Sequence, residues 1–120
     1  MDELFPPGVI GFPVTPFNHD HSLDLSGFAR NLEIILSNPF TAFVAAGGTG
    51  ELYSLARDEY LSVIRSAVEE TDGTMPIIAG VGYGSHIAQI MASEAEKIGA
   101  SAILVLPPYY SNACFDGVLA

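Results

Sequence analysis

The chain is 120 residues long and carries 4 basic against 14 acidic side chains, for a net charge of −10 at pH 7. That length allows one domain at most. So acidic a chain repels phosphate backbones and anionic lipid, and no stretch of it is long and apolar enough to span a membrane. We therefore expect neither a nucleic-acid nor a membrane partner.

The cell compartment is predicted from the chain start and the cysteine count. The start, Met-Asp-Glu-Leu-Phe-Pro-Pro, is acidic, whereas a secretory signal begins with a basic segment followed by an apolar run. Cys114 is the single cysteine, so an intramolecular disulfide and a cysteine-based metal site are excluded. A cytoplasmic location is expected.

Four short, continuous apolar runs predict strands. Each is bounded by glycine or proline, and the absence of alternation indicates strands that are covered on both faces, as in parallel sheets. The runs are Val9–Val14, Ala42–Ala46, Ile77–Val81 and Ala102–Leu106.

Three segments with helical periodicity separate these runs. Asp24 and Ser85 are the expected N-caps of the first and third helices, and Gly99 is the expected end of the third. The order β-α-β-α-β-α-β predicts right-handed crossovers and a parallel sheet. The expected apolar stripes are Phe28, Leu32 and Ile35; Leu61, Ile64 and Val68; and Ile87, Met91, Ala95 and Ile98.

The segment Gly47-Gly-Thr-Gly-Glu51 directly follows the second predicted strand. Its three glycines allow a sharp turn that brings backbone N–H groups to an anion such as a carboxylate, and Thr49 adds a hydroxyl donor. An ordinary strand-to-helix turn is an equally good interpretation. The segment is not a phosphate-binding P-loop, because the Lys-Ser/Thr ending is missing.

Two further features lie at predicted strand ends. Gly80, Gly82 and Gly84 lack the spacing of a dinucleotide fingerprint, so a packing or pocket-floor role is favoured over a nucleotide site. Tyr109 and Tyr110 follow the fourth strand, where α/β enzymes place catalytic groups, although a pair of aromatics covering the sheet end is the simpler interpretation.

The remaining chemistry-bearing side chains do not predict a site. His19 and His21 lack a third metal ligand, and His86 opens a helix where water reaches it. Lys97 is the single lysine and falls on the polar side of a helix beside Glu94 and Glu96. A Schiff-base lysine is normally desolvated, so Lys97 is not expected to act as one.

Taken together, four motifs resemble the dihydrodipicolinate synthase and N-acetylneuraminate lyase superfamily. They occur in order over nearly the whole chain: Phe12-Pro-Val-Thr-Pro-Phe17, Gly47-Gly-Thr-Gly-Glu51, Pro76-Ile-Ile-Ala-Gly80 and Ile103-Leu-Val-Leu-Pro-Pro-Tyr-Tyr110. Most aldolase and synthase members carry threonine where this chain has Gly48. The Gly-Gly-Thr-Gly-Glu form is similar to the 5-dehydro-4-deoxyglucarate dehydratase branch.

The resemblance implies an α/β fold, the (β/α)8 TIM barrel, of which this chain supplies about the first four strands. Residues 1–120 would be the N-terminal half of a single barrel domain, with the C-terminal half and its Schiff-base lysine absent. The branch dehydrates and decarboxylates 5-dehydro-4-deoxy-D-glucarate to 2,5-dioxopentanoate with no metal or organic cofactor, as a homo-oligomer that acts on a small 2-oxo sugar acid. Gly48 and Thr49 would bind the substrate carboxylate, and Tyr110 would be a proton relay.

Two alternatives remain open. The chain could belong to another 2-oxo-acid aldolase or synthase of the superfamily, or it could be a noncatalytic, truncated half-barrel. Four strands without closing partners would leave two sheet edges exposed. In either case we expect the isolated 120-residue chain to be inactive.

Overall fold

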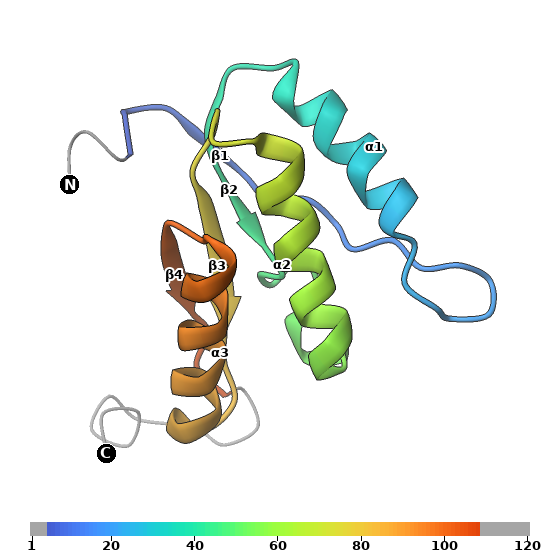
Figure 1. Cartoon of the computed structure of the whole chain (residues 1–120), viewed down its shortest axis with the longest axis vertical. Coiled ribbons are helices and arrows are strands. Elements are labelled where there is room, and N and C mark those ends of the chain that lie inside the picture. The colour runs from blue at the N-terminus through green and yellow to red at the C-terminus, as the bar shows by residue number, and fades with distance from the viewer. Residues whose placement is uncertain (1–4, 109–120) are drawn as a thin grey trace.

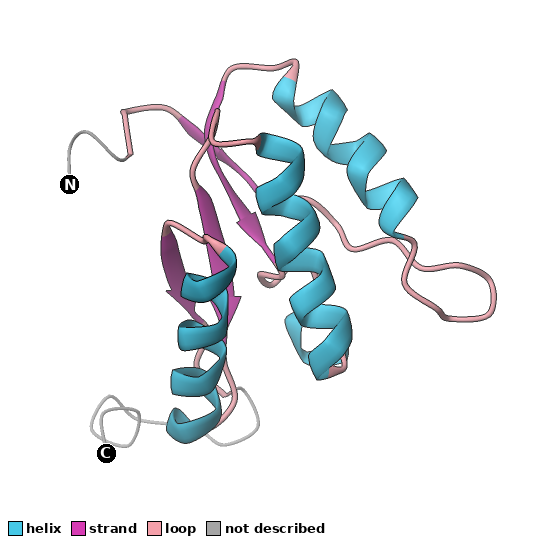
Figure 2. Cartoon of the chain, viewed as in Figure 1, coloured by secondary structure: helices cyan, strands magenta, loops and turns pink. Residues whose placement is uncertain are grey.

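The computed structural model describes residues 5–108, in which four strands alternate with three α-helices (Figures 1 and 2). The elements in chain order are β1 Val9–Gly11, α1 Leu25–Leu36, β2 Phe40–Ala45, the short 3-10 helix η1 Leu52–Ser54, α2 Arg57–Thr71, β3 Ile77–Val81, α3 Ser85–Ile98 and β4 Ala102–Val105. The predicted alternation of strands and helices is confirmed.

The sheet is parallel and its spatial order follows the chain order, β1-β2-β3-β4. The three helices lie on one face of this sheet, and each packs against the next (Figure 2). A doubly wound sheet would instead reverse its strand order and carry helices on both faces. The described residues therefore form half of a (β/α)8 barrel rather than a flavodoxin-like sheet.

The core lies between the helices and the sheet. Phe28 and Leu32 of α1 and Ile64 of α2 are fully buried, together with Phe43 of β2 and Ala79 of β3. Each fully buried large apolar side chain contributes about 1.5–3 kcal/mol relative to exposure.

The first helix begins as predicted. A carboxylate oxygen of Asp24 accepts a hydrogen bond from the backbone N–H of Gly27 at 2.8 Å. A cap of this kind stabilises a helix by about 1 kcal/mol, because the first N–H groups of a helix have no partner within it. Arg30 and Glu33 point to solvent as expected.

Some local predictions were wrong. The N-cap of α3 is Gly84 and not Ser85. The first strand, β1, was predicted to reach Val14 but ends at Gly11, because Pro13 has no N–H to donate to a neighbouring strand. The buried stripe of α2 is turned from the predicted one and consists of Tyr60, Val63, Ile64, Ala67 and Thr71. Ile87 of α3 is exposed, because it borders a cavity between α2 and α3.

Coverage of every strand on both faces was also expected, and this is wrong for the two edge strands. Val9 of β1 is 60% exposed, and Ile103 and Val105 of β4 are 45% and 61% exposed. Within the described residues neither strand has a neighbour on its outer side. Large apolar groups on strand edges of this kind favour association. None of the helices within residues 5–108 has the length and apolar character needed to cross a membrane.

Candidate functional site at the carboxyl ends of the strands

The loops that follow the strands meet at one edge of the sheet, because all four strands run in the same direction. The hydroxyl of Thr15, beyond β1, is buried and donates to the carbonyl oxygen of Gly50, beyond β2, at 2.7 Å. The N–H of Leu106, beyond β4, donates to the carbonyl oxygen of Val81 at 2.8 Å. The first bond joins the segment after β1 to the glycine loop, residues 46–51, and the second joins the ends of β3 and β4.

The glycines of this loop permit close approach, and the left-handed backbone at the two ends of the loop falls on residues that are not glycine. Ala46 and Glu51 have φ values of +50° and +56°. A Cβ on Gly50 would lie 3.0 Å from the Cα of Ala46. A Cβ on Gly80 of β3 would overlap the carbonyl oxygen of Ala46, so the glycine loop lies directly on that strand. The predicted packing role of Gly80 is confirmed.

The glycine loop presents unpaired donors to solvent. Gly48 and Thr49 are exposed, and their backbone N–H groups, like the hydroxyl of Thr49, have no hydrogen-bond partner in the described part of the chain. The N–H groups of Glu51 and Leu52 instead close the turn by donating to the carbonyls of Gly48 and Gly47. Adjacent free donors of this kind suit a carboxylate.

Two tyrosines that were not predicted as site residues lie at the same edge. Tyr53 follows the glycine loop and Tyr83 follows β3, and their rings meet edge to face with centroids 4.8 Å apart. The hydroxyl of Tyr53 lies 2.9 Å from the carbonyl oxygen of Leu106. Their positions just after two parallel strands were the available signal, since such residues meet at the sheet edge. Tyr109 and Tyr110 lie outside the described residues.

The other candidate side chains stand apart from this edge. His19 and His21 are exposed in the turn between Phe17 and Leu23, which pair as an antiparallel bridge. His86 is exposed in the first turn of α3, and Lys97 is exposed in its last turn. Residues 5–108 contain no group of three or more potential metal ligands.

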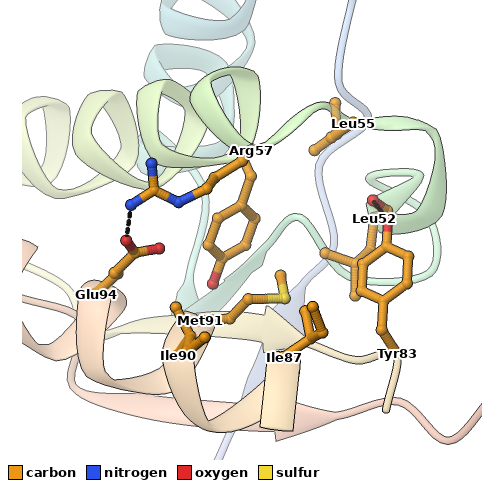
Figure 3. Close-up of a pocket in the computed structure, with 9 residues that line it drawn as sticks. Leu52, Leu55, Arg57, Tyr83, Ile87, Ile90, Met91 and Glu94 are labelled. Atoms are coloured by element: carbon orange, nitrogen blue, oxygen red, sulfur yellow. Dashed lines mark hydrogen bonds and ion pairs between the residues drawn. The ribbon is translucent and has the colours of Figure 1, made fainter.

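A cavity of about 360 Å³ lies between the amino-terminal halves of α2 and α3 (Figure 3). Its wall is mainly apolar, with Leu52, Leu55, Ile87, Ile90 and Met91, and its polar members are Arg57, Glu94, Tyr60 and Tyr83. Arg57 and Glu94 pair with each other and so join α2 to α3 (Figure 3). A carboxylate that entered this mainly apolar cavity would therefore compete with Glu94 for Arg57.

Tyr60 is 2% exposed, and its hydroxyl has no hydrogen-bond partner within residues 5–108. Burial, together with the nearby charge of Glu94, raises the pKa of Tyr60 above its usual value. We expect Tyr60→Phe to stabilise the chain by about 1 kcal/mol at pH 7 in urea unfolding, because an unpaired buried hydroxyl costs about 1–3 kcal/mol.

The same variant has a predicted pH dependence. Because the folded-state pKa lies above the unfolded value of about 10, the unfolded chain loses the tyrosine proton first. The wild type should therefore lose stability as the pH rises above about 10, and the advantage of Tyr60→Phe should grow there. A variant that is less stable than the wild type at pH 7 would contradict the geometry.

Comparison with known proteins agrees with this architecture. A sequence model described as the dihydrodipicolinate synthetase family matches residues 6–120. A Bradyrhizobium protein described as a probable 5-dehydro-4-deoxyglucarate dehydratase is 45% identical over 113 residues, which cover 94% of this chain and 36% of that protein. A Xanthomonas campestris protein with the same description is 44% identical over 118 residues, which cover 98% and 39%.

Solved structures with the same arrangement are dihydrodipicolinate synthases. The Acinetobacter baumannii enzyme, in complex with pyruvate, and the Bacillus clausii enzyme each match with a TM-score of 0.86 and 29% identity. Each match covers 92% of this chain and 38% of the solved one. The chain thus spans less than two fifths of the length of these relatives.

Proposed function

This chain belongs to the dihydrodipicolinate synthetase family, and on that basis we propose that residues 1–120 form the N-terminal half of a single barrel domain in a 5-dehydro-4-deoxyglucarate dehydratase. The complete enzyme would convert 5-dehydro-4-deoxy-D-glucarate to 2,5-dioxopentanoate with release of one water and one CO₂. It would work in the cytoplasm as a homo-oligomer. The identities of 42–45% to proteins described as this dehydratase support the assignment.

The proposed chemistry divides between the two halves of the barrel. A lysine from beyond these 120 residues would condense with the 2-oxo group of the substrate, and the resulting iminium would accept electrons as water and CO₂ leave. Lys97 does not suit that role, because it is exposed at the far end of α3. No metal or organic cofactor takes part in this scheme.

The residues of this half would bind substrate and move protons. Gly48 and Thr49 would hold the carboxylate next to the 2-oxo group, and Tyr110 would relay a proton. The observation that carries the proposal is the pair of exposed, unpaired N–H groups in the glycine loop at the carboxyl ends of the strands. Catalytic groups of TIM barrels lie at this end.

The test uses a hybrid barrel, in which residues 1–120 of this chain replace the matching segment of the Bradyrhizobium relative. We expect the hybrid barrel to release CO₂ from 5-dehydro-4-deoxyglucarate with a kcat/KM within about tenfold of the intact relative. The relative itself is the matched control, because both proteins share the same C-terminal half.

Other outcomes would favour the alternatives. A folded hybrid barrel that condenses pyruvate with an aldehyde but releases no CO₂ would favour an aldolase or synthase. A folded hybrid barrel with neither activity would favour a noncatalytic half-barrel and overturn the proposal.

A further inference from the structure

The hydroxyl of Tyr53 joins two loops that are far apart in sequence. It lies 2.9 Å from the carbonyl oxygen of Leu106 and 3.1 Å from that of Pro107, so its one proton is shared between consecutive carbonyls just beyond β4. Neither proline of the Pro107-Pro108 pair has an N–H, so this segment cannot be tied down by its own backbone donors there. A side-chain donor replaces them.

The position of the Tyr53 ring is itself supported by the loop after β3. Tyr83 packs edge-on against it, and the Tyr83 hydroxyl donates to the carbonyl oxygen of Leu52 at 3.2 Å. Tyr83 has a φ of +66°, a conformation that is costly for an aromatic residue and is maintained only when its surroundings hold it. Gly82 provides the room, since a Cβ there would lie 2.8 Å from the Tyr53 hydroxyl.

We propose that Tyr53 is a positioning residue that fixes the Leu106–Pro108 segment, which precedes Tyr110 in the sequence, against the glycine loop. The catalytic part of this inference rests on the proposed function, in which Tyr110 relays a proton. The hydrogen bonds themselves do not depend on it. Tyr53 touches neither substrate nor reacting atoms in this scheme and acts through the segment that it holds.

The first test measures amide hydrogen exchange in the full 120-residue chain. Tyr53→Phe removes only the hydroxyl and keeps the ring against Tyr83. We expect the Leu106 N–H, which donates to Val81 at the same strand end, to exchange roughly fivefold faster, with the amides of β2 unchanged. Tyr60→Phe is the matched control, because it removes a tyrosine hydroxyl that contacts no described carbonyl, and it should leave Leu106 unchanged.

A second variant disturbs the contact between Tyr53 and Leu106 without changing Tyr53 itself. In Gly82→Ala the new methyl group would lie 2.8 Å from the Tyr53 hydroxyl and 3.2 Å from the Leu106 carbonyl oxygen, so it crowds both partners of the contact and the Leu106 amide should exchange faster there as well. Unchanged Leu106 exchange in Tyr53→Phe, or a uniform acceleration over all strands, would overturn the inference.

The second test measures kinetics in the hybrid barrel. We expect Tyr53→Phe to lower kcat about five- to tenfold with KM within about twofold, because the carboxylate donors of the glycine loop are untouched. In a Tyr110→Phe background, Tyr53→Phe should not lower kcat further, since both substitutions act through the Tyr110 hydroxyl. Additive losses would overturn the inference. A Tyr110→Phe hybrid barrel that keeps the full kcat would overturn both the proposed relay and the catalytic part of the inference. The hydrogen-exchange experiment would still decide whether the hydrogen bonds of Tyr53 exist.

Discussion

Gly80→Ala should destabilise the chain by about 3 kcal/mol or more. A methyl group at this position would overlap the carbonyl oxygen of Ala46 and lie 2.7 Å from its carbonyl carbon. Both are backbone atoms, so no flexible side chain can move aside, and overpacking of this kind is at the costly end of its range. The displaced residues, Ala46 and Gly47, begin the glycine loop, so the candidate site should be lost with the stability.

The loss of stability is measured by urea unfolding, with circular dichroism as the signal. Gly48→Ala is the control variant. A Cβ at Gly48 meets a single neighbour, the Leu106 side chain, at 4.0 Å, and its φ is not positive. That variant should stay within about 0.5 kcal/mol of the wild type. Equal stability of the Gly80 and Gly48 variants would show that the loop does not lie on β3 as described.

Thr49→Ala should lower kcat/KM of the hybrid barrel roughly ten- to a hundredfold. The variant removes the hydroxyl donor that we assign to the substrate carboxylate, and a hydrogen bond to a charged group is worth about 1.5–3 kcal/mol. Thr49 is exposed and its hydroxyl bonds no other described residue, so stability should not change.

Thr74→Ala is the matched control for this kinetic experiment. Thr74 lies just before β3, at the opposite edge of the sheet, and its hydroxyl donates to the Thr71 carbonyl at 2.5 Å. Its replacement should leave kcat/KM unchanged. Equal kinetics for the Thr49 variant and the wild type would return the glycine loop to the status of an ordinary turn.

The features that could be predicted from the sequence are those that depend on residues close together along the chain. Continuous apolar runs located all four strands, and the spacing of Phe28 and Leu32 located the buried face of α1. The cap at Asp24 was predictable because it is a local interaction. The Asp24 carboxylate accepts from the N–H of Gly27, three residues later, and no contact with the rest of the fold is needed. The family motifs then gave the barrel architecture, which four strands alone do not specify.

The features that sequence did not predict depend on contacts between distant loops. The left-handed backbone falls on Ala46 and Glu51, and no local pattern in the sequence marks these two residues. The burial of Tyr60 arises from how α2 packs on α3, and periodicity alone favoured Leu61. The contact of Tyr53 with Leu106 spans 53 residues, and no local pattern encodes it.

A crystal structure of the hybrid barrel with pyruvate bound would test the proposed carboxylate site most directly. We expect a carboxylate oxygen within about 2.7–3.2 Å of the Gly48 or Thr49 N–H groups and of the Thr49 hydroxyl. Pyruvate bound elsewhere, for example in the cavity between α2 and α3, with the glycine loop unoccupied, would contradict it.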